Sequence, residues 1–101
     1  MNYRRTIVAN LKWQEDRLIL SGELSFANAM AIYEESLLEL KNKKSFIFDF
    51  REVSASNSVG LALMIEWIKL AQKHGKPIQF INIPQDLSAL AKAARLDALL
   101  G

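Results

Sequence analysis

The chain has 101 residues, of which 50% are hydrophobic and 24% charged, and its formal net charge is +2. This composition is typical of a globular protein with one core, so we expect a single domain spanning residues 1–101. The near balance of charge gives no support to nucleic-acid binding. The sequence contains no cysteine, which excludes disulfides, thiolate catalysis and cysteine-ligated metals.

The sequence shows no targeting or membrane-spanning segment. Residues 1–9 lack an apolar core long enough for a signal peptide, and no run approaches the ~18 apolar residues of a membrane span. We therefore expect a cytoplasmic protein.

The first half of the chain predicts two strands and a helix. Residues 6–9 and 17–20 are predicted strands, and Gly22 is predicted to close the second with a turn. Ser25 can cap a helix over residues 26–41, followed by a lysine cluster that suits a helix C-terminus (Lys41, Lys43 and Lys44). The apolar residues at helical spacing are predicted to face the core: Phe26, Ala29, Met30, Tyr33, Leu37 and Leu40.

The second half predicts alternating strands and helices. Residues 45–50 are apolar at consecutive positions, which fits a central strand covered on both faces. A long helix over residues 58–74 ends at Gly75, and residues 78–83 form the next strand. Pro84 opens a last helix whose predicted inner residues are Leu87, Leu90, Ala91, Ala94 and Leu96. The order β-β-α-β-α-β-α indicates an α/β fold with helices largely on one face of the sheet or at its edges.

Residues 53–58 lie between the central strand and the long helix, and most of them have small hydroxyl or amide side chains. Asn57 or Ser58 can cap that helix, because a short side-chain oxygen accepts a hydrogen bond from an unpaired backbone N–H. The partial positive charge of a helix N-terminus would also favour a phosphate on Ser58. The alternative is that these are ordinary loop and cap residues.

One side of the long helix carries an apolar residue outside the predicted core face. The core face is an arc of apolar residues: Val59, Leu61, Leu63, Met64, Trp67, Ile68, Leu70 and Ala71. Ala62 and Ile65 fall instead among polar residues, on the side of Ser58. A single exposed isoleucine needs no explanation, but Ser58, Ala62, Ile65 and Lys69 together could form a docking surface with an apolar centre.

The sequence lacks the residue sets of common enzymes. Its one histidine, His74, stands at a predicted helix end, so Ser-His-Asp and Cys-His sites are excluded. No glycine-rich phosphate-binding loop is present. Asp49, at a predicted strand end, and Glu52 have no nucleophile or activated water beside them, so a structural role is expected. We therefore expect no catalysis, no cofactor and no metal.

Two stretches resemble the STAS family (sulfate transporter and anti-sigma factor antagonist domains). Residues 49–53, Asp-Phe-Arg-Glu-Val, and 57–61, Asn-Ser-Val-Gly-Leu, resemble a buried strand ending in Asp, a short loop and an Asp-Ser/Thr-x-Gly-Leu helix start. Residues 22–25, Gly-Glu-Leu-Ser, resemble the family's Gly-x-Leu-Asp turn. The resemblance covers essentially the whole chain. It implies a mixed sheet of about four strands, helices packed mainly on one face, and function through docking rather than catalysis.

The resemblance implies two kinds of partner. In anti-sigma factor antagonists the residue at the position of Ser58 is phosphorylated by a partner kinase, the anti-sigma factor, and the added charge releases that partner. Residues 60–63 and the helix that follows are more similar to the MlaB group. Those members are STAS subunits of an ABC system that moves phospholipid to maintain outer-membrane asymmetry in Gram-negative bacteria, and they contact its ATPase subunit, MlaF.

Two departures from the family pattern are present, and the first favours the transporter interpretation. Asn57 replaces the family's Asp, which keeps the cap but removes a charge that kinase recognition uses, and Ser25 replaces the turn Asp. We expect docking on an MlaF-like ABC ATPase subunit at the cytoplasmic face of the inner membrane; the alternative is an antagonist regulated through Ser58. The expected contact residues are Ser56, Asn57, Ser58, Ala62, Ile65 and Lys69. A third class, a carrier of lipid or another small molecule, would need an apolar cavity, of which the sequence gives no sign.

Overall fold

The computed structural model describes residues 10–96, which contain one four-stranded sheet with the spatial order β1-β2-β3-β4. The strands are β1 (Leu11–Gln14), β2 (Arg17–Glu23), β3 (Phe46–Ala55) and β4 (Ile78–Ile81). β1 runs antiparallel to β2, whereas β2, β3 and β4 are mutually parallel. The sheet is therefore mixed, as the family resemblance implied.

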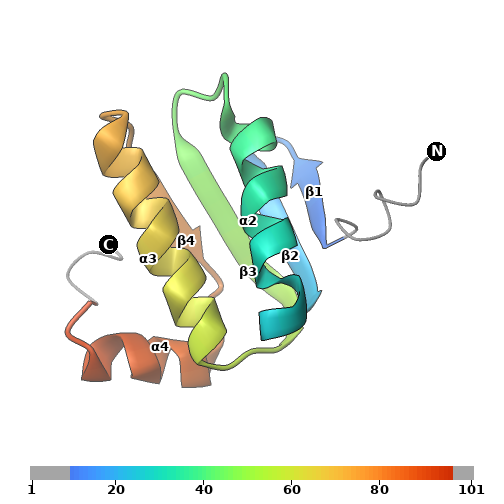
Figure 1. Cartoon of the computed structure of the whole chain (residues 1–101), viewed down its shortest axis with the longest axis vertical. Helices are drawn as coiled ribbons and strands as arrows, with labels where there is room; N and C mark the ends of the chain where they lie inside the picture. The colour runs from blue at the N-terminus through green and yellow to red at the C-terminus, as the bar shows by residue number, and fades with distance from the viewer. Residues whose placement is uncertain (1–9, 97–101) are drawn as a thin grey trace.

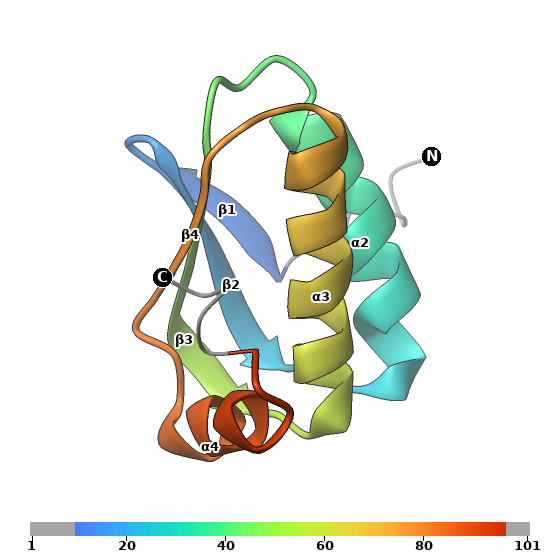
Figure 2. The same ribbon diagram turned by 90° about the vertical axis from the view of Figure 1, so that its left-hand side faces the viewer.

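Three helices alternate with these strands: α2 (Phe26–Leu40), α3 (Ser58–Lys73) and α4 (Gln85–Ala93). α2 and α3 lie side by side over one face of the sheet, and α4 lies at the end of the molecule where α3 begins (Figures 1 and 2). β2 and β3 are each followed by a helix that crosses to the next parallel strand, which places α2 and α3 on the same face. The α/β class, the element order and the one-sided helix layer are confirmed.

Several strand boundaries differ from the sequence prediction. The predicted strand at residues 6–9 lies outside the described residues, whereas Leu11–Gln14 was missed although its side chains alternate between half-buried and exposed. β2 does not end at a turn: it passes through Gly22, whose φ is 77°, and the register of its pairing with β3 shifts there. β3 extends to Ala55, so Asp49 lies in mid-strand and the loop before α3 is short.

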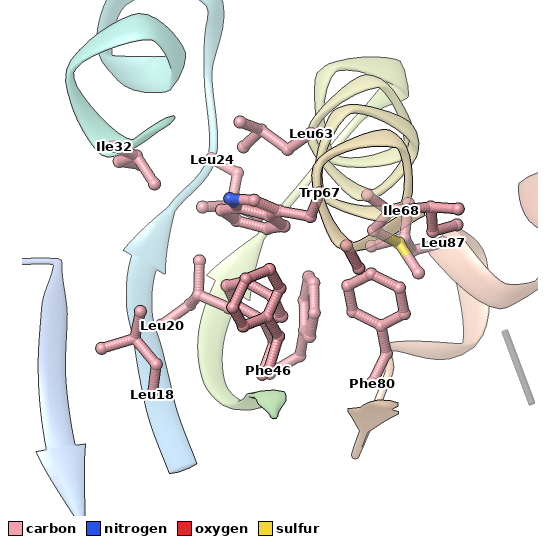
Figure 3. Close-up of a cluster of buried hydrophobic side chains, with 14 of the residues drawn as sticks. Leu18, Leu20, Leu24, Ile32, Phe46, Leu63, Trp67, Ile68, Phe80 and Leu87 are labelled. Carbon is pink, nitrogen blue, oxygen red and sulfur yellow. The ribbon is translucent and has the colours of Figure 1, made fainter. Parts of the chain in front are cut away.

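The core fills the layer between the sheet and the two covering helices (Figure 3). Trp67 of α3 stacks on Phe48 of β3 with ring centroids 4.1 Å apart, and Phe80 of β4 lies 5.5 Å from Phe48. The buried Trp67 Nε1–H donates to Ser36 Oγ at 2.8 Å, so the indole nitrogen has a partner where water is excluded. This contact links α3 to α2.

The predicted inner face of α2 was partly wrong. Phe26 is 78% exposed and Met30 67% exposed, while Ile32 and Ser36 are buried together with the predicted Leu40. The last helix shows a smaller error of the same kind, because Leu87 and Ala91 are buried whereas Leu90 is 39% exposed and Ala94 and Leu96 are not buried. The inward face of α3, in contrast, is the predicted apolar arc.

The sheet face away from the helices carries a polar cluster around Asp49. This carboxylate is fully buried, and it pairs with the guanidinium groups of Arg17 and Arg51, each at 3.4 Å, and accepts 3.0 Å from Asn82 Nδ2. These partners cover Asp49 on the face of β3 that has no helix. Residues 48–50 are therefore all buried although helices cover only one face of the strand. Glu52 pairs separately with Lys12 at 3.2 Å, so the two carboxylates form separate ion pairs rather than an acid–base pair.

Hydrogen bonds determine the charge state of Asp49. Burial alone raises the pKa of a carboxyl group, but the Asn82 amide, the Arg51 backbone N–H and the two guanidinium groups stabilise the carboxylate more strongly. The pKa of Asp49 is therefore lowered from its ordinary value. Asp49 is a charged structural residue that joins β2, β3 and the chain after β4.

Candidate docking site

The start of α3 is organised by Asn57. Its backbone is extended, with a φ of −141°, and its Oδ1 accepts a hydrogen bond from the Val59 backbone N–H at 2.8 Å. This is the capping interaction expected from the sequence, and it satisfies one of the unpaired donors of the first turn. Ser58 follows as the first residue of α3, and its side chain is exposed.

Gly60 allows the loop and α4 to approach the first turn of α3. A Cβ added at Gly60 would overlap the Ser56 hydroxyl oxygen and would lie 3.3 Å from Leu87 Cδ2 of α4. The missing side chain therefore lets Ser56 fold against α3 while Leu87 packs on the same turn. Gly60 belongs to the family motif, but its contact with α4 was not predicted from the sequence.

Four residues, which we call the docking strip, run along one side of α3: Ser58, Ala62, Ile65 and Lys69. Their spacing places them on one side of a helix. Ser58, Ala62 and Lys69 are exposed, and Ile65 is half-buried and lies outside the core cluster that holds the predicted apolar arc. Lys69 Nζ lies 3.6 Å from Glu66 Oε2, an exposed ion pair that contributes little to stability. The structure thus brings these residues together; their role as contacts stays a prediction.

The start of α2 lies at the same end of the molecule as the start of α3 (Figure 1). The Leu24 backbone N–H donates to the Ala55 carbonyl at 2.9 Å, which ties the end of β2 to the end of β3. Phe26 follows two residues later and is 78% exposed. Helical periodicity predicted that Phe26 faces the core, so its exposure was not expected from the sequence.

A family model described as "Mlab, STAS domain" matches residues 7–101. The chain belongs to the STAS domain family. Members of this family are generally non-catalytic regulatory or accessory proteins. A comparison with curated protein sequences gave no match.

Solved structures of STAS domains share this fold. A chain of the Acinetobacter MlaFEDB complex in an ATP-bound conformation is 22% identical, with a TM-score of 0.68 over 82% of this chain and 88% of that chain. A candidate anti-sigma factor antagonist from Thermotoga maritima is 16% identical, with a TM-score of 0.76 over 99% and 87% of the two chains. Unphosphorylated SpoIIAA, also an anti-sigma factor antagonist, is 14% identical, with a TM-score of 0.62 over 90% and 96%. The chain therefore resembles both kinds of STAS protein.

The described part of this STAS domain shows neither a metal site nor a membrane span. Among residues 10–96, no group of three or more His, Cys, Asp or Glu side chains could hold a metal ion. Over the same range, no helix is long and apolar enough to cross a bilayer. His74 is the C-cap of α3, and its backbone N–H donates to the Leu70 carbonyl at 3.2 Å, which agrees with the helix-terminal position expected for it.

Proposed function

We propose that this single STAS domain is a non-catalytic protein that docks on the ATPase subunit of an Mla-type ABC phospholipid-transport system, at the cytoplasmic face of the inner membrane. The observation that carries the proposal is the docking strip, in which Ile65 stands outside the core between exposed Ala62 and Lys69. The contact surface comprises the strip and the two loop residues before it, Ser56 and Asn57.

The similarity to Mla proteins supports this choice of partner. The matching family model carries the name Mlab, and one structural neighbour belongs to a complex that was captured with ATP bound. A domain without catalytic groups that accompanies an ATPase can act by binding it, because a partner that binds only the folded or active form of a protein shifts that protein's equilibrium. Regulation or stabilisation of the ATPase follows from such binding.

The strip has the features of a small interaction surface. Ile65 supplies apolar area that a partner can cover, and exposed Ala62 leaves room for close approach. Ser58 adds a hydroxyl group that can donate or accept a hydrogen bond at the edge of the contact. The distance from residue 58 to residue 69 along the helix axis is about 16 Å, which suits part of a standard interface.

A second candidate function is that of an anti-sigma factor antagonist. It is favoured by the exposure of Ser58 at a helix N-terminus, where a phosphate group is electrostatically accepted, and by the fold shared with SpoIIAA. Asn57 weighs against it, because this residue caps α3 without the charge of the aspartate in the family pattern. The two functions differ in partner and in chemistry at Ser58.

The deciding experiment compares two partners on two charge variants. The purified chain is tested for binding to an Mla-type ATPase subunit and to an anti-sigma factor kinase. We expect Ser58→Glu to weaken ATPase binding at least ~10-fold, because it adds a charge that the interface must desolvate. Gln79→Glu on β4 is the matched control, since it adds the same charge at an exposed position away from α3.

The outcomes separate the alternatives. Loss of ATPase binding in Ser58→Glu but not in Gln79→Glu supports the proposal, provided that both variants unfold in urea like the wild type. Transfer of phosphate from ATP to Ser58 by the kinase, detected by mass spectrometry, would replace it with the antagonist function. Unchanged ATPase affinity in Ser58→Glu would exclude Ser58 from the contact.

A further inference from the structure

A pocket lies where α2 and α3 end. In Figure 1 these two helix ends lie at the opposite end of the molecule from the start of α3. Its volume is about 210 Å³ and it is open to solvent on one side. The lining residues come from both helices and from the start of β3 and the segment before β4: Leu37, Leu40, Lys41, Phe46, Leu70, His74 and Lys76. None of them belongs to the docking strip.

The pocket arises from the way the two helices pack. Midway along their length, Trp67 and Ser36 fill the space between α3 and α2 through their hydrogen bond. About one turn farther on, Leu40 of α2 and Leu70 of α3 line the pocket together with Phe46 of β3. The result is an apolar floor that remains accessible beside the helix ends.

The rim of the pocket is cationic. Lys41 is exposed directly after α2, and Lys76 Nζ donates to the Lys43 carbonyl at 2.6 Å, 5.7 Å from the Phe46 ring centroid. This hydrogen bond holds the Lys76 ammonium group beside the apolar floor. No lining residue is acidic. Lys43 is directed elsewhere, since its Nζ lies 4.4 Å over the Trp13 ring.

We propose that this pocket, the basic pocket, binds a small amphiphilic anion. The apolar chain of the ligand contacts Leu37, Leu40 and Leu70, and its carboxylate or phosphate monoester pairs with Lys41 and Lys76. An apolar cavity of about 150 Å³ holds a benzene molecule, so the basic pocket accommodates a chain of roughly six to eight carbon atoms. The paired arrangement of apolar floor and positive rim selects against neutral and cationic molecules of the same length.

The test uses octanoate and octyl phosphate, both below their micelle concentrations, with the full chain labelled for amide NMR. We expect saturable shifts of the amides of Leu37, Leu40, Leu70 and Lys76, with octylammonium binding at least ~10-fold more weakly than octanoate. The absence of saturable shifts with both anions, or equal affinity for octylammonium, would overturn the proposal.

Variants test the two halves of the basic pocket. The double variant Lys41→Gln/Lys76→Gln should lower octanoate affinity about 10-fold, whereas Lys69→Gln on the docking strip should not change it. Leu37→Trp, at a partly exposed position, should fill the pocket and abolish binding while the spectrum stays dispersed. Wild-type affinity in both pocket variants would contradict the site.

Vesicles distinguish a free anion from a lipid headgroup. Binding to phosphatidylglycerol vesicles that octanoate displaces would support the site with a membrane lipid as the source of the ligand. Octanoate binding without vesicle binding would support it with a free anion as the source. Vesicle binding that persists in Leu37→Trp and resists octanoate would instead show that the lysines around the pocket bind a membrane surface. That result would overturn the pocket as the ligand site.

Discussion

The helices α3 and α2 rest on the same face of one sheet, yet they use their apolar residues differently. α3 buries its apolar arc, including Trp67, against the sheet. α2 buries Ile32 and Leu40 but leaves Phe26 and Met30 largely exposed. Both helices show apolar residues at helical spacing, so periodicity alone does not distinguish a buried face from an exposed one.

The neighbours of each helix account for this difference. Trp67 of α3 stacks on the inner strand β3 and also lies near Phe80 of β4, so apolar rings from neighbouring strands cover it. α2 lies nearer the β1 edge, where the Trp13 indole N–H donates to Glu39 of this helix. α3 also contacts both α2 and α4, whereas Phe26 and Met30 of α2 are left uncovered by the neighbouring elements.

The sharpest test of this comparison pairs one residue from each helix. Trp67→Ala should lower the free energy of unfolding by about 3–5 kcal/mol, because it removes a buried ring and leaves a cavity next to Phe48. Phe26→Ala should change it by less than about 0.5 kcal/mol, since that ring is mostly in water. Urea unfolding measures both. A similar loss of unfolding free energy in the two variants would show that α2 also buries the side that carries Phe26.

A second test asks whether the helix side alone stabilises the sheet. Asp49→Asn on the opposite face should lower the free energy of unfolding by about 2–3 kcal/mol at pH 7, because the charged partners Arg17 and Arg51 lose their carboxylate. Urea unfolding at neutral pH gives this difference. Gln79→Asn, an exposed change on β4, serves as the control and should have little effect.

The same carboxyl group predicts a dependence on pH. The folded pKa of Asp49 lies below its unfolded value of about 3.9, so its stabilisation is complete above that value and is lost as pH falls through the folded pKa. The stability difference between wild type and Asp49→Asn should therefore shrink as the pH is lowered below about 4. A difference that stays constant down to pH 2.5 would contradict the assignment.

A smaller effect is expected at the start of α3. Gly60→Ala should lower the free energy of unfolding by about 1–2 kcal/mol, because the steric overlap with Ser56 and the close contact with Leu87 exceed the gain in helix propensity. Adding Ser56→Gly should restore part of the loss, since it removes the hydroxyl oxygen that the new methyl group meets. Thermal unfolding of the single and double variants tests this coupling. Additive losses would show that Ser56 does not limit the space at Gly60.

The last prediction concerns binding rather than folding. Ile65→Ala on α3 should weaken binding to the ATPase subunit by about 1–2 kcal/mol if Ile65 is an apolar anchor. Leu38→Ala on α2, at a residue that is 70% exposed, is the matched control and should leave affinity unchanged. Calorimetric titration of the two variants gives the comparison. A larger loss for Leu38→Ala would move the contact surface from α3 to α2.

The sequence predicted the helices better than the strands. Caps and stops bound the helices, as Asn57 and Gly75 show for α3, and these signals are local. β2 and β3 were predicted too short because their later residues are held in the sheet by neighbouring strands rather than by their own apolar pattern. Leu11–Gln14 was missed although it alternates apolar and polar residues, because the β-branched residues at 6–9 predict a strand more strongly.

The residues of the candidate site were predicted from the sequence, but not all of the contacts that position them. A cap at Asn57 or Ser58 was expected from their short side-chain oxygens, and the structure places it at Asn57. The side shared by Ser58, Ala62 and Ile65 follows from helical periodicity. The contact of Leu87 with the first turn of α3 could not be read from the sequence, because the two residues meet only when α4 folds back.

The sequence by itself determined the α/β order, the STAS family pattern, the capped start of α3 and the arc that this helix buries, because each depends on residues close together in the chain. Tertiary structure decided which side of α2 meets water, that Asp49 is buried in mid-strand, and that the ends of α2 and α3 enclose the basic pocket. Those features depend on which distant segments become neighbours in the fold. The burial of a residue is determined by its neighbours in space rather than by the residues beside it in the sequence.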